Sequence, residues 1–235
     1  MRLLLLAALG LVAPTIGMAQ PVDRPVVVEL FTSQGCSSCP PADAKVADLA
    51  RTRPDLLPLT FHVTYWNGLG WRDPFSLDAA TERQRHYVAL GVSPNVYTPA
   101  LVVDGTLDVV GSNPGAVDRA VQLATSNQET AADIEIQRGS RSVTVLVGAG
   151  TGQARLLLVG YDRLHRTHVG RGENSGRTLE EANVVRSIQV LGAWAGKPIA
   201  LQAPLPAGEE IAVLLQRADG RIVGARKAHG AANAF

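Results

Sequence analysis

The first half of the chain alternates between continuous apolar runs and apolar residues at helical spacing. Residues 26–32 form a nearly unbroken apolar run, which is typical of a parallel strand covered on both faces. Residues 42–51 carry apolar side chains at helical spacing, and residues 57–64 form a second apolar run. The pattern therefore predicts a β-α-β unit whose two strands are parallel.

Further elements are predicted before residue 127. A helix is predicted over residues 78–90, because a glycine follows it in the position that glycine favours. An apolar run after Pro99 leads to an Asp-Gly turn and a second run at residues 107–110, which predicts a β-hairpin. An Asn-Pro pair then opens a helix over residues 113–126, with proline at its first position.

The second half of the chain has a different pattern, with short apolar runs separated by turn residues. Strands are predicted at residues 131–138, 142–147, 154–161, 184–190, 198–201, 211–216 and 221–225. Repeated short strands with little helix are typical of a β-sandwich. We therefore expect two domains, an α/β domain over residues 20–127 and an all-β, sandwich-like domain over residues 128–235.

Residues 1–19 have the pattern of a secretory signal peptide. A basic residue, Arg2, precedes an apolar run over residues 3–13, and small residues lead to an expected cleavage site after Ala19. The apolar run is too short to span a bilayer, and no later run is long enough to do so. The mature protein is therefore expected to be exported, to the periplasm or out of the cell, without a membrane span.

Charge and cysteine content narrow the function classes. The chain has 22 Lys and Arg residues against 21 Asp and Glu residues, and removal of Arg2 with the signal peptide balances them. Nucleic-acid binding needs a basic face, and no Lys/Arg cluster supplies one. An exported chain can form disulfides, but two cysteines are too few for a disulfide scaffold.

The two cysteines, Cys36 and Cys39, follow the first predicted strand with C-x-x-C spacing and precede a helix. Because a helix N-terminus stabilises a thiolate, the spacing indicates a redox pair with Cys36 as the exposed nucleophile and Cys39 as the resolving thiol. A structural disulfide and a metal-binding pair are the alternatives. Closing so short a loop contributes only about 2 kcal/mol, which favours the redox interpretation.

Two prolines, Pro40 and Pro41, follow the second cysteine directly. Proline disfavours helical backbone in the residue before it and clashes with an earlier carbonyl inside a helix. A regular helix that starts at Ser38 or Cys39, with Cys36 in the preceding loop, fits these prolines.

Two separated features resemble the thioredoxin superfamily: Cys36-Ser37-Ser38-Cys39 after the first strand, and Thr98-Pro99 before the third. The resemblance covers residues 24–127 and implies a thioredoxin-like fold there. In that superfamily the proline is cis and packs against the cysteines. The resemblance thus implies that Pro99 and the backbone of Thr98 dock the extended chain of a partner. Because the proline pair places Cys36 in the loop before the helix, we expect weaker stabilisation of its thiolate than in thioredoxin.

A narrower resemblance links the chain to a family of bacterial secreted thioredoxin-like proteins whose function is not established. It is carried by residues 29–43, by Gly70-Trp71 and by residues 97–99, and it extends into the second half through residues 171–174 and 183–186. This resemblance supports the fold and the exported location and adds little about a substrate.

Glu29 interrupts the apolar first strand seven residues before Cys36. Thioredoxins place a buried carboxylate near this position as a proton acceptor. The resemblance therefore implies a Glu29 whose pKa is raised by desolvation and which acts as general base to Cys39. The alternative is a carboxylate at the edge of the sheet.

Aromatic residues are concentrated between residues 61 and 75, and Tyr65, Trp66 and Trp71 are the candidates for a substrate-binding wall beside the cysteines. The alternative is that they pack the core and the loop. His62 is expected to be a structural hydrogen-bond donor at a strand end. No metal ligands are assigned, because His165 and His168 would lie on opposite faces of a strand.

The leading hypothesis is an exported thiol–disulfide oxidoreductase, or a redox partner, that acts through the Cys36–Cys39 pair without a cofactor. Its expected substrates are protein thiols and disulfides, with a separate protein as electron donor or acceptor. Two alternatives stay open: a copper-binding or copper-delivery protein that uses the cysteine pair, and a non-catalytic protein-interaction module on a thioredoxin-like scaffold.

Overall fold

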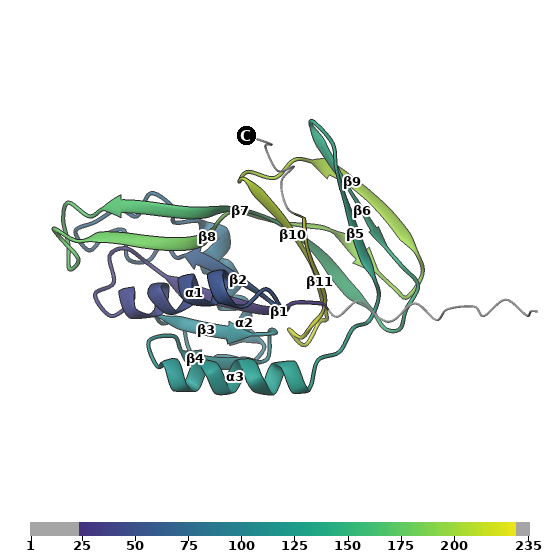
Figure 1. Ribbon diagram of the computed structural model, residues 1–235, viewed down its shortest axis with the longest axis horizontal. Helices are drawn as coiled ribbons and strands as arrows, with labels where there is room; N and C mark the ends of the chain where they lie inside the picture. The colour runs from purple at the N-terminus through teal and green to yellow at the C-terminus, as the bar shows by residue number, and fades with distance from the viewer. Residues whose placement is uncertain (1–23, 229–235) are drawn as a thin grey trace, which may run out of the picture.

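A long mixed β-sheet runs through the computed structural model, with three helices on one part of it and a second, smaller sheet on another (Figure 1). The structure describes residues 24–228, so the predicted signal peptide lies outside the described residues. The helices are α1 (Pro40–Thr52), α2 (Asp78–Ala89) and α3 (Pro114–Ser126). The strands are β1 (Val26–Thr32), β2 (Leu56–His62), β3 (Ala100–Val103), β4 (Leu107–Val110), β5 (Ile134–Arg138), β6 (Ser142–Val147), β7 (Ala154–His168), β8 (Thr178–Trp194), β9 (Ile199–Pro204), β10 (Glu210–Gln216) and β11 (Ile222–Ala228).

Strand β1 is the centre of the first half, and every residue in it is buried. It pairs in parallel with β2 and antiparallel with β3, which confirms the predicted β-α-β unit. Because side chains alternate along a strand, Val28 and Leu30 pack with α1 and α3. Val27 and Phe31 face the other way, into the cluster that contains Tyr87 of α2. This alternation decides which residues can reach the cysteines.

The second half joins the same sheet. Strand β8 lies beside β2 in parallel, with Thr60 opposite Val184. The Thr60 hydroxyl donates to the Ala182 carbonyl at 2.7 Å, and the Asn183 amide donates to the Pro58 carbonyl at 2.8 Å. The strand order β11-β10-β7-β8-β2-β1-β3-β4 is therefore continuous across the expected boundary at residue 127. The division into two domains stays a prediction.

Strands β7 and β8 form a hairpin much longer than the apolar pattern predicts, with 15 and 17 residues. In Figure 1 its far end extends at the left, away from β5, β6 and β9. The predicted strands, residues 154–161 and 184–190, lie within its apolar part and miss the last four residues of β8. Residues 162–168 and 178–183 continue the pairing with mostly polar side chains, many of them exposed, so no apolar run reveals them.

The small sheet has the order β5-β6-β9 and packs on the neighbouring strands β7 and β10 of the long sheet. Val143 and Val145 of β6 belong to the same buried cluster as Leu156 of β7 and Val213 of β10. Two packed sheets of this kind are compatible with the sandwich-like layout predicted for the second half, and that assignment stays a prediction.

A buried ion pair joins β1, α2 and β10. The Arg83 guanidinium donates to both carboxylate oxygens of Glu29, at 2.5 and 2.9 Å, and to the side-chain carbonyl of Gln216 at 3.2 Å. The Tyr87 hydroxyl donates to the same carboxylate. Each charge is paired and hydrogen-bonded, so the attraction between the two ions and their hydrogen bonds offset the free-energy cost of removing them from water.

We expect Arg83→Met to lower the free energy of unfolding by about 3–5 kcal/mol, because it leaves the Glu29 carboxylate buried without a counter-charge. The double variant Glu29→Leu/Arg83→Met should recover most of this loss, since it removes both charges. Urea denaturation of both variants measures the difference. A double variant no more stable than Arg83→Met would show that the loss comes from packing and not from the unpaired charge.

Candidate functional site

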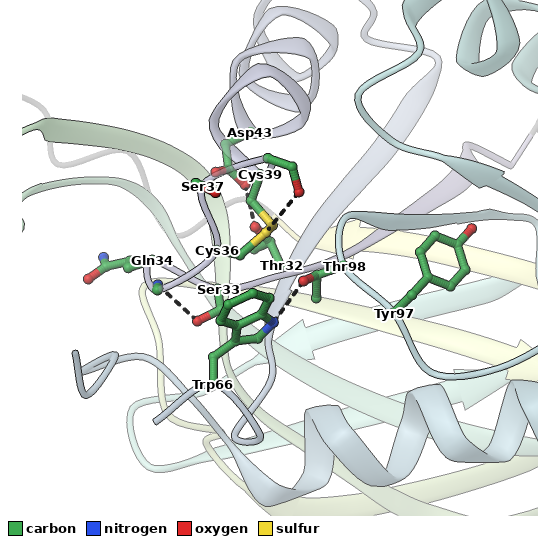
Figure 2. The surroundings of a disulfide bond; sticks show 12 residues. Thr32, Ser33, Gln34, Cys36, Ser37, Cys39, Asp43, Trp66, Tyr97 and Thr98 are labelled. Carbon is green, nitrogen blue, oxygen red and sulfur yellow. Dashed lines mark hydrogen bonds between the residues drawn. A yellow bond between two sulfur atoms is a disulfide. The ribbon is translucent and has the colours of Figure 1, made fainter. Parts of the chain in front are cut away.

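The two cysteines form a disulfide between the end of β1 and the start of α1 (Figure 2). Their Cα atoms are 5.4 Å apart. Helix α1 begins at Pro40 with Cys39 at its N-cap, and the two prolines occupy the first helical positions, where no amide hydrogen is needed. Cys36 lies in the preceding loop, as the proline pair predicted.

Both cysteines are completely buried, with 0% of their surface exposed. The expectation that Cys36 is exposed is therefore wrong for this state of the protein. The Asn174 amide donates to the carbonyls of Gln34 and Cys36, at 3.0 and 2.8 Å, and covers the loop from one side. Trp66 packs at Gly35, and Figure 2 shows it on the side of the disulfide away from α1.

The residues expected to bind a substrate form hydrogen bonds with different parts of the structure around this loop. The Thr98–Pro99 peptide bond is cis, as the resemblance implied. The Trp66 indole donates to the Thr98 hydroxyl at 2.8 Å, and the Trp71 indole donates to the Gln34 side chain at 3.0 Å. Tyr65 is partly exposed, and its hydroxyl donates to Gln84 of α2.

Glu29 does not reach Cys39. Its side chain leaves β1 on the face that packs against α2, whereas the cysteines and α1 are reached from the other face, through Thr32. Its carboxylate is also fully engaged by Arg83 and Tyr87. The expectation that Glu29 acts as a general base to Cys39 is thus corrected by the alternation of side chains along the strand.

The carboxylate beside the cysteines is Asp43, in the first turns of α1. Its amide donates to the Cys39 carbonyl at 3.1 Å, and its Oδ1 accepts from the Thr32 hydroxyl at 2.8 Å. Figure 2 shows its side chain next to Cys39 and Thr32. Burial, together with the nearby Glu181 carboxylate, raises the pKa of Asp43 to about 7. The sequence pattern indicated only that Asp43 suits a helix N-terminus.

His62, at the end of β2, lies in the same buried cluster and donates to Asp73, with Nδ1 and Oδ2 2.7 Å apart. Burial opposes the charged imidazolium, but the charge and hydrogen bond of Asp73, with the charge of Glu181, outweigh it and raise the pKa of His62 to about 9. His62 is thus the hydrogen-bond donor that the sequence predicted.

Asp73 and Glu181 both hold the loop that carries the cysteines. Asp73 accepts from the Gln34 backbone amide at 2.8 Å, and Glu181 accepts from the Gln34 side chain at 2.8 Å. The charge and hydrogen bond of His62 outweigh burial and lower the pKa of Asp73. Burial raises the pKa of Glu181. The cluster therefore contains an ion pair and further carboxylates that burial disfavours as anions.

The turn between β7 and β8 supplies the other contacts that sequence reasoning missed. Besides Asn174, it carries Glu173, whose carboxylate accepts from the Ser37 amide at 3.0 Å. The sequence analysis noted residues 171–174 only as part of a family resemblance. Neither spacing nor polarity reveals that this loop folds back onto residues 138 positions earlier in the chain.

Neither a metal site nor a membrane-spanning helix is found in the described part of the chain. Within residues 24–228, no group of three or more His, Cys, Asp or Glu side chains is arranged to hold a metal ion. No helix in that range is long and apolar enough to cross a membrane.

Comparison with known proteins places the chain in a family without assigned function. Residues 27–216 match the family described as "Protein of unknown function (DUF1223)", and the chain belongs to it. A crystal structure of a protein from Agrobacterium tumefaciens, solved in a structural genomics programme, is similar over 92% of this chain and 99% of that one, with 33% identity and a TM-score of 0.76. The structure of HBP35 of Porphyromonas gingivalis has a TM-score of 0.57 at 14% identity, over 91% of this chain and 79% of that one, which indicates a shared fold alone. No curated protein matches the chain.

We expect the protein to lose stability as the pH rises from about 6.5 to 9. A group whose pKa is raised in the folded state stabilises the fold below its unfolded pKa, which is 6.5 for histidine, and this contribution is lost as the pH passes the folded value of about 9. The loss from His62 is at most about 3 kcal/mol. Urea denaturation at several pH values should show a smaller loss over this interval in His62→Gln. Parallel pH curves for the two proteins would contradict this role of His62.

Proposed function

We propose that the protein is an exported thiol–disulfide exchange protein whose first half is a thioredoxin-like domain. The observation that carries this proposal is the Cys36–Cys39 disulfide at the start of α1, with the cis Thr98–Pro99 bond before β3. A disulfide with a two-residue spacer contributes little to stability and is suited to exchange. The signal-peptide pattern of residues 1–19 supports export, which would place the pair where disulfides persist.

The exchange consists of two thiolate displacements. The thiolate of a partner attacks Cys36 Sγ, the Cys36–Cys39 bond breaks, and Cys39 Sγ leaves with the electron pair and takes up a proton. A second thiolate of the partner then attacks the partner's own sulfur in the mixed disulfide. The bond to Cys36 breaks, and Cys36 is released as a thiolate. The partner becomes a disulfide and the cysteine pair becomes a dithiol. The reverse sequence reduces a partner disulfide, and the reduction potential of the pair decides the direction.

Exchange requires the buried disulfide to become accessible, and the β7–β8 turn is the element we propose to move. Its contact with the cysteine loop consists of a few polar groups, chiefly Asn174 with two carbonyls and Glu173 with the Ser37 amide. A turn at the end of a polar hairpin opens locally at low cost compared with a packed strand. Opening on this side would expose the Cys36 end of the disulfide to a partner.

The function is tested by the reduction potential of the pair, measured on residues 20–235 in graded glutathione buffers. A potential above roughly −270 mV would place the pair among exchanging thiol proteins. In addition, Cys39→Ser should form a stable mixed disulfide with oxidised glutathione through Cys36, detected by intact mass. Cys36→Ser is the matched control and should react more slowly. A potential below about −300 mV, or no adduct on Cys36, would contradict the exchange function.

We also expect Asn174→Ala to raise the rate at which reduced glutathione opens the disulfide. The variant removes two hydrogen bonds that hold the turn on the cysteine loop, each worth about 1 kcal/mol, so the rate should rise roughly 5- to 30-fold. Ser175→Ala is the control, because Ser175 bonds only within the turn, to Gly170. Equal rates in Asn174→Ala and the wild type would show that access does not pass through this turn.

Complete burial of both cysteines favours a second candidate, a non-catalytic interaction module in which the disulfide is structural. It predicts a potential below about −300 mV and a fold that binds its partner equally well when both cysteines are replaced by serine. The same potential measurement therefore separates the two candidates.

A further inference from the structure

Three buried side-chain atoms in the described part of the chain have no hydrogen-bond partner, and all three belong to the cluster beside the disulfide. They are Asp43 Oδ2, His62 Nε2 and Glu181 Oε1. The side chains come from α1, β2 and β8, and each is at most 3% exposed. Buried polar atoms are almost always paired, so three unpaired atoms in one place need a common explanation.

In each of these side chains the other polar atom is already engaged. Asp43 Oδ1 accepts from Thr32, His62 Nδ1 donates to Asp73, and Glu181 Oε2 accepts from Gln34. The remaining atoms are therefore fixed in position. His62 Nε2 and Glu181 Oε1 are 3.9 Å apart, which is too far for a direct hydrogen bond.

Ionisation of every titratable side chain in this buried cluster at once would cost a large amount of free energy. One imidazolium faces the carboxylates of Asp43, Asp73 and Glu181, and the burial of all of them disfavours a surplus of negative charge. The Asp73 carboxylate is held as the anion by its contact with His62. Burial raises the pKa of Asp43 to about 7 and also raises the pKa of Glu181, so these two carboxyl groups are the ones in the cluster that bind a proton most readily.

Two observations connect this proton to the cysteines and to solvent. Asp43 follows Cys39 by about one helical turn, its amide donates to the Cys39 carbonyl, and its side chain lies beside Cys39 in Figure 2. Asp43 also lines a cavity of about 320 Å³ between α1 and the start of β8. The charged side chains that line this cavity with it are Arg51 of α1, and Arg177 and Glu180 of the hairpin.

We propose, on the basis of the exchange function above, that Asp43, His62 and Glu181 form a buried proton-exchange site for Cys39. When the disulfide opens, Cys39 Sγ leaves as a thiolate and takes the proton of the Asp43 carboxyl group. When Cys39 closes the disulfide again, Asp43 accepts the proton of its thiol, the thiolate attacks the Cys36 sulfur of the mixed disulfide, and the partner leaves as a thiolate. His62 stabilises the ionised form of the two carboxylates between these steps.

The closing step can be followed alone with Ellman's reagent on the reduced protein. The first thionitrobenzoate is released when Cys36 forms the mixed disulfide, and the second when Cys39 displaces it. The rate of the second release is measured by stopped flow between pH 6 and 9. We expect it to rise in the wild type through a midpoint near the pKa of Asp43, about 7. In Asp43→Asn the midpoint near 7 should be lost, so that the rate rises only at higher pH as the Cys39 thiol itself ionises. The rate at pH 7 should fall on the order of 100-fold, as for loss of a general base.

A second variant gives a result that a purely structural role would not produce. Glu181→Gln removes a carboxylate that raises the pKa of Asp43, so the midpoint of the wild-type profile should move to lower pH. Asp118→Asn is the control: it makes the same exchange on an exposed residue of α3 that pairs with Lys45, away from the cavity that Asp43 lines, and it should leave the profile unchanged. If Asp43→Asn does not fold, the direction in which Glu181→Gln moves the pH midpoint tests the proton-exchange site by itself.

The outcomes separate the two levels of the hypothesis. If the wild type never releases the second thionitrobenzoate, Cys39 does not resolve mixed disulfides, and both the exchange function and this site are wrong. If the second release occurs with the same pH profile in all variants, exchange stands and the proton-exchange site is wrong. Loss of the midpoint near pH 7 in Asp43→Asn, together with a downward shift in Glu181→Gln, supports both.

Discussion

The environment of the disulfide depends on one residue, Gln34, whose polar groups contact four residues from distant parts of the chain. Its backbone amide donates to Asp73, its side-chain amide donates to Glu181, its side-chain carbonyl accepts from Trp71, and its backbone carbonyl accepts from Asn174. A buried loop has to satisfy its backbone in this way or pay for it in stability. None of these partners is close in sequence, so contacts from both halves of the chain hold the loop that carries Cys36.

This dependence gives the pairing of β2 with β8 a role beyond extending the sheet. It places Glu181 beside His62 and directs the β7–β8 turn back over the cysteines. A sheet that was interrupted between the two halves would leave the disulfide end of β1 open on that side. The second half therefore contributes to the site itself, whatever partner it recognises, and a fragment ending at residue 127 would lack both the cover and one carboxylate of the cluster.

The sequence predicted most of the local structure and the position of the cysteine pair, because apolar runs and proline positions act over short distances. It failed where contacts are long-range. The polar part of the β7–β8 hairpin has no apolar pattern, so its strands were predicted too short. Glu29 was placed beside Cys39 by analogy, although the alternation along β1 already puts residues 27, 29 and 31 on the other face. Asp43 could not be singled out, since its burial comes from β1 and β8 and not from α1.

Two of the buried charge clusters within residues 24–228 differ in a way that bears on function. Around Glu29 and Arg83, opposite charges are matched and multiply hydrogen-bonded, as expected of a group that only has to be stable. Around Asp43, like charges are gathered and three polar atoms lack protein partners, which lowers the stability of the fold. A structural disulfide needs no such cluster beside it. A disulfide that opens and closes does, because each opening creates a thiolate in a buried site, and a buried thiolate has to find a proton.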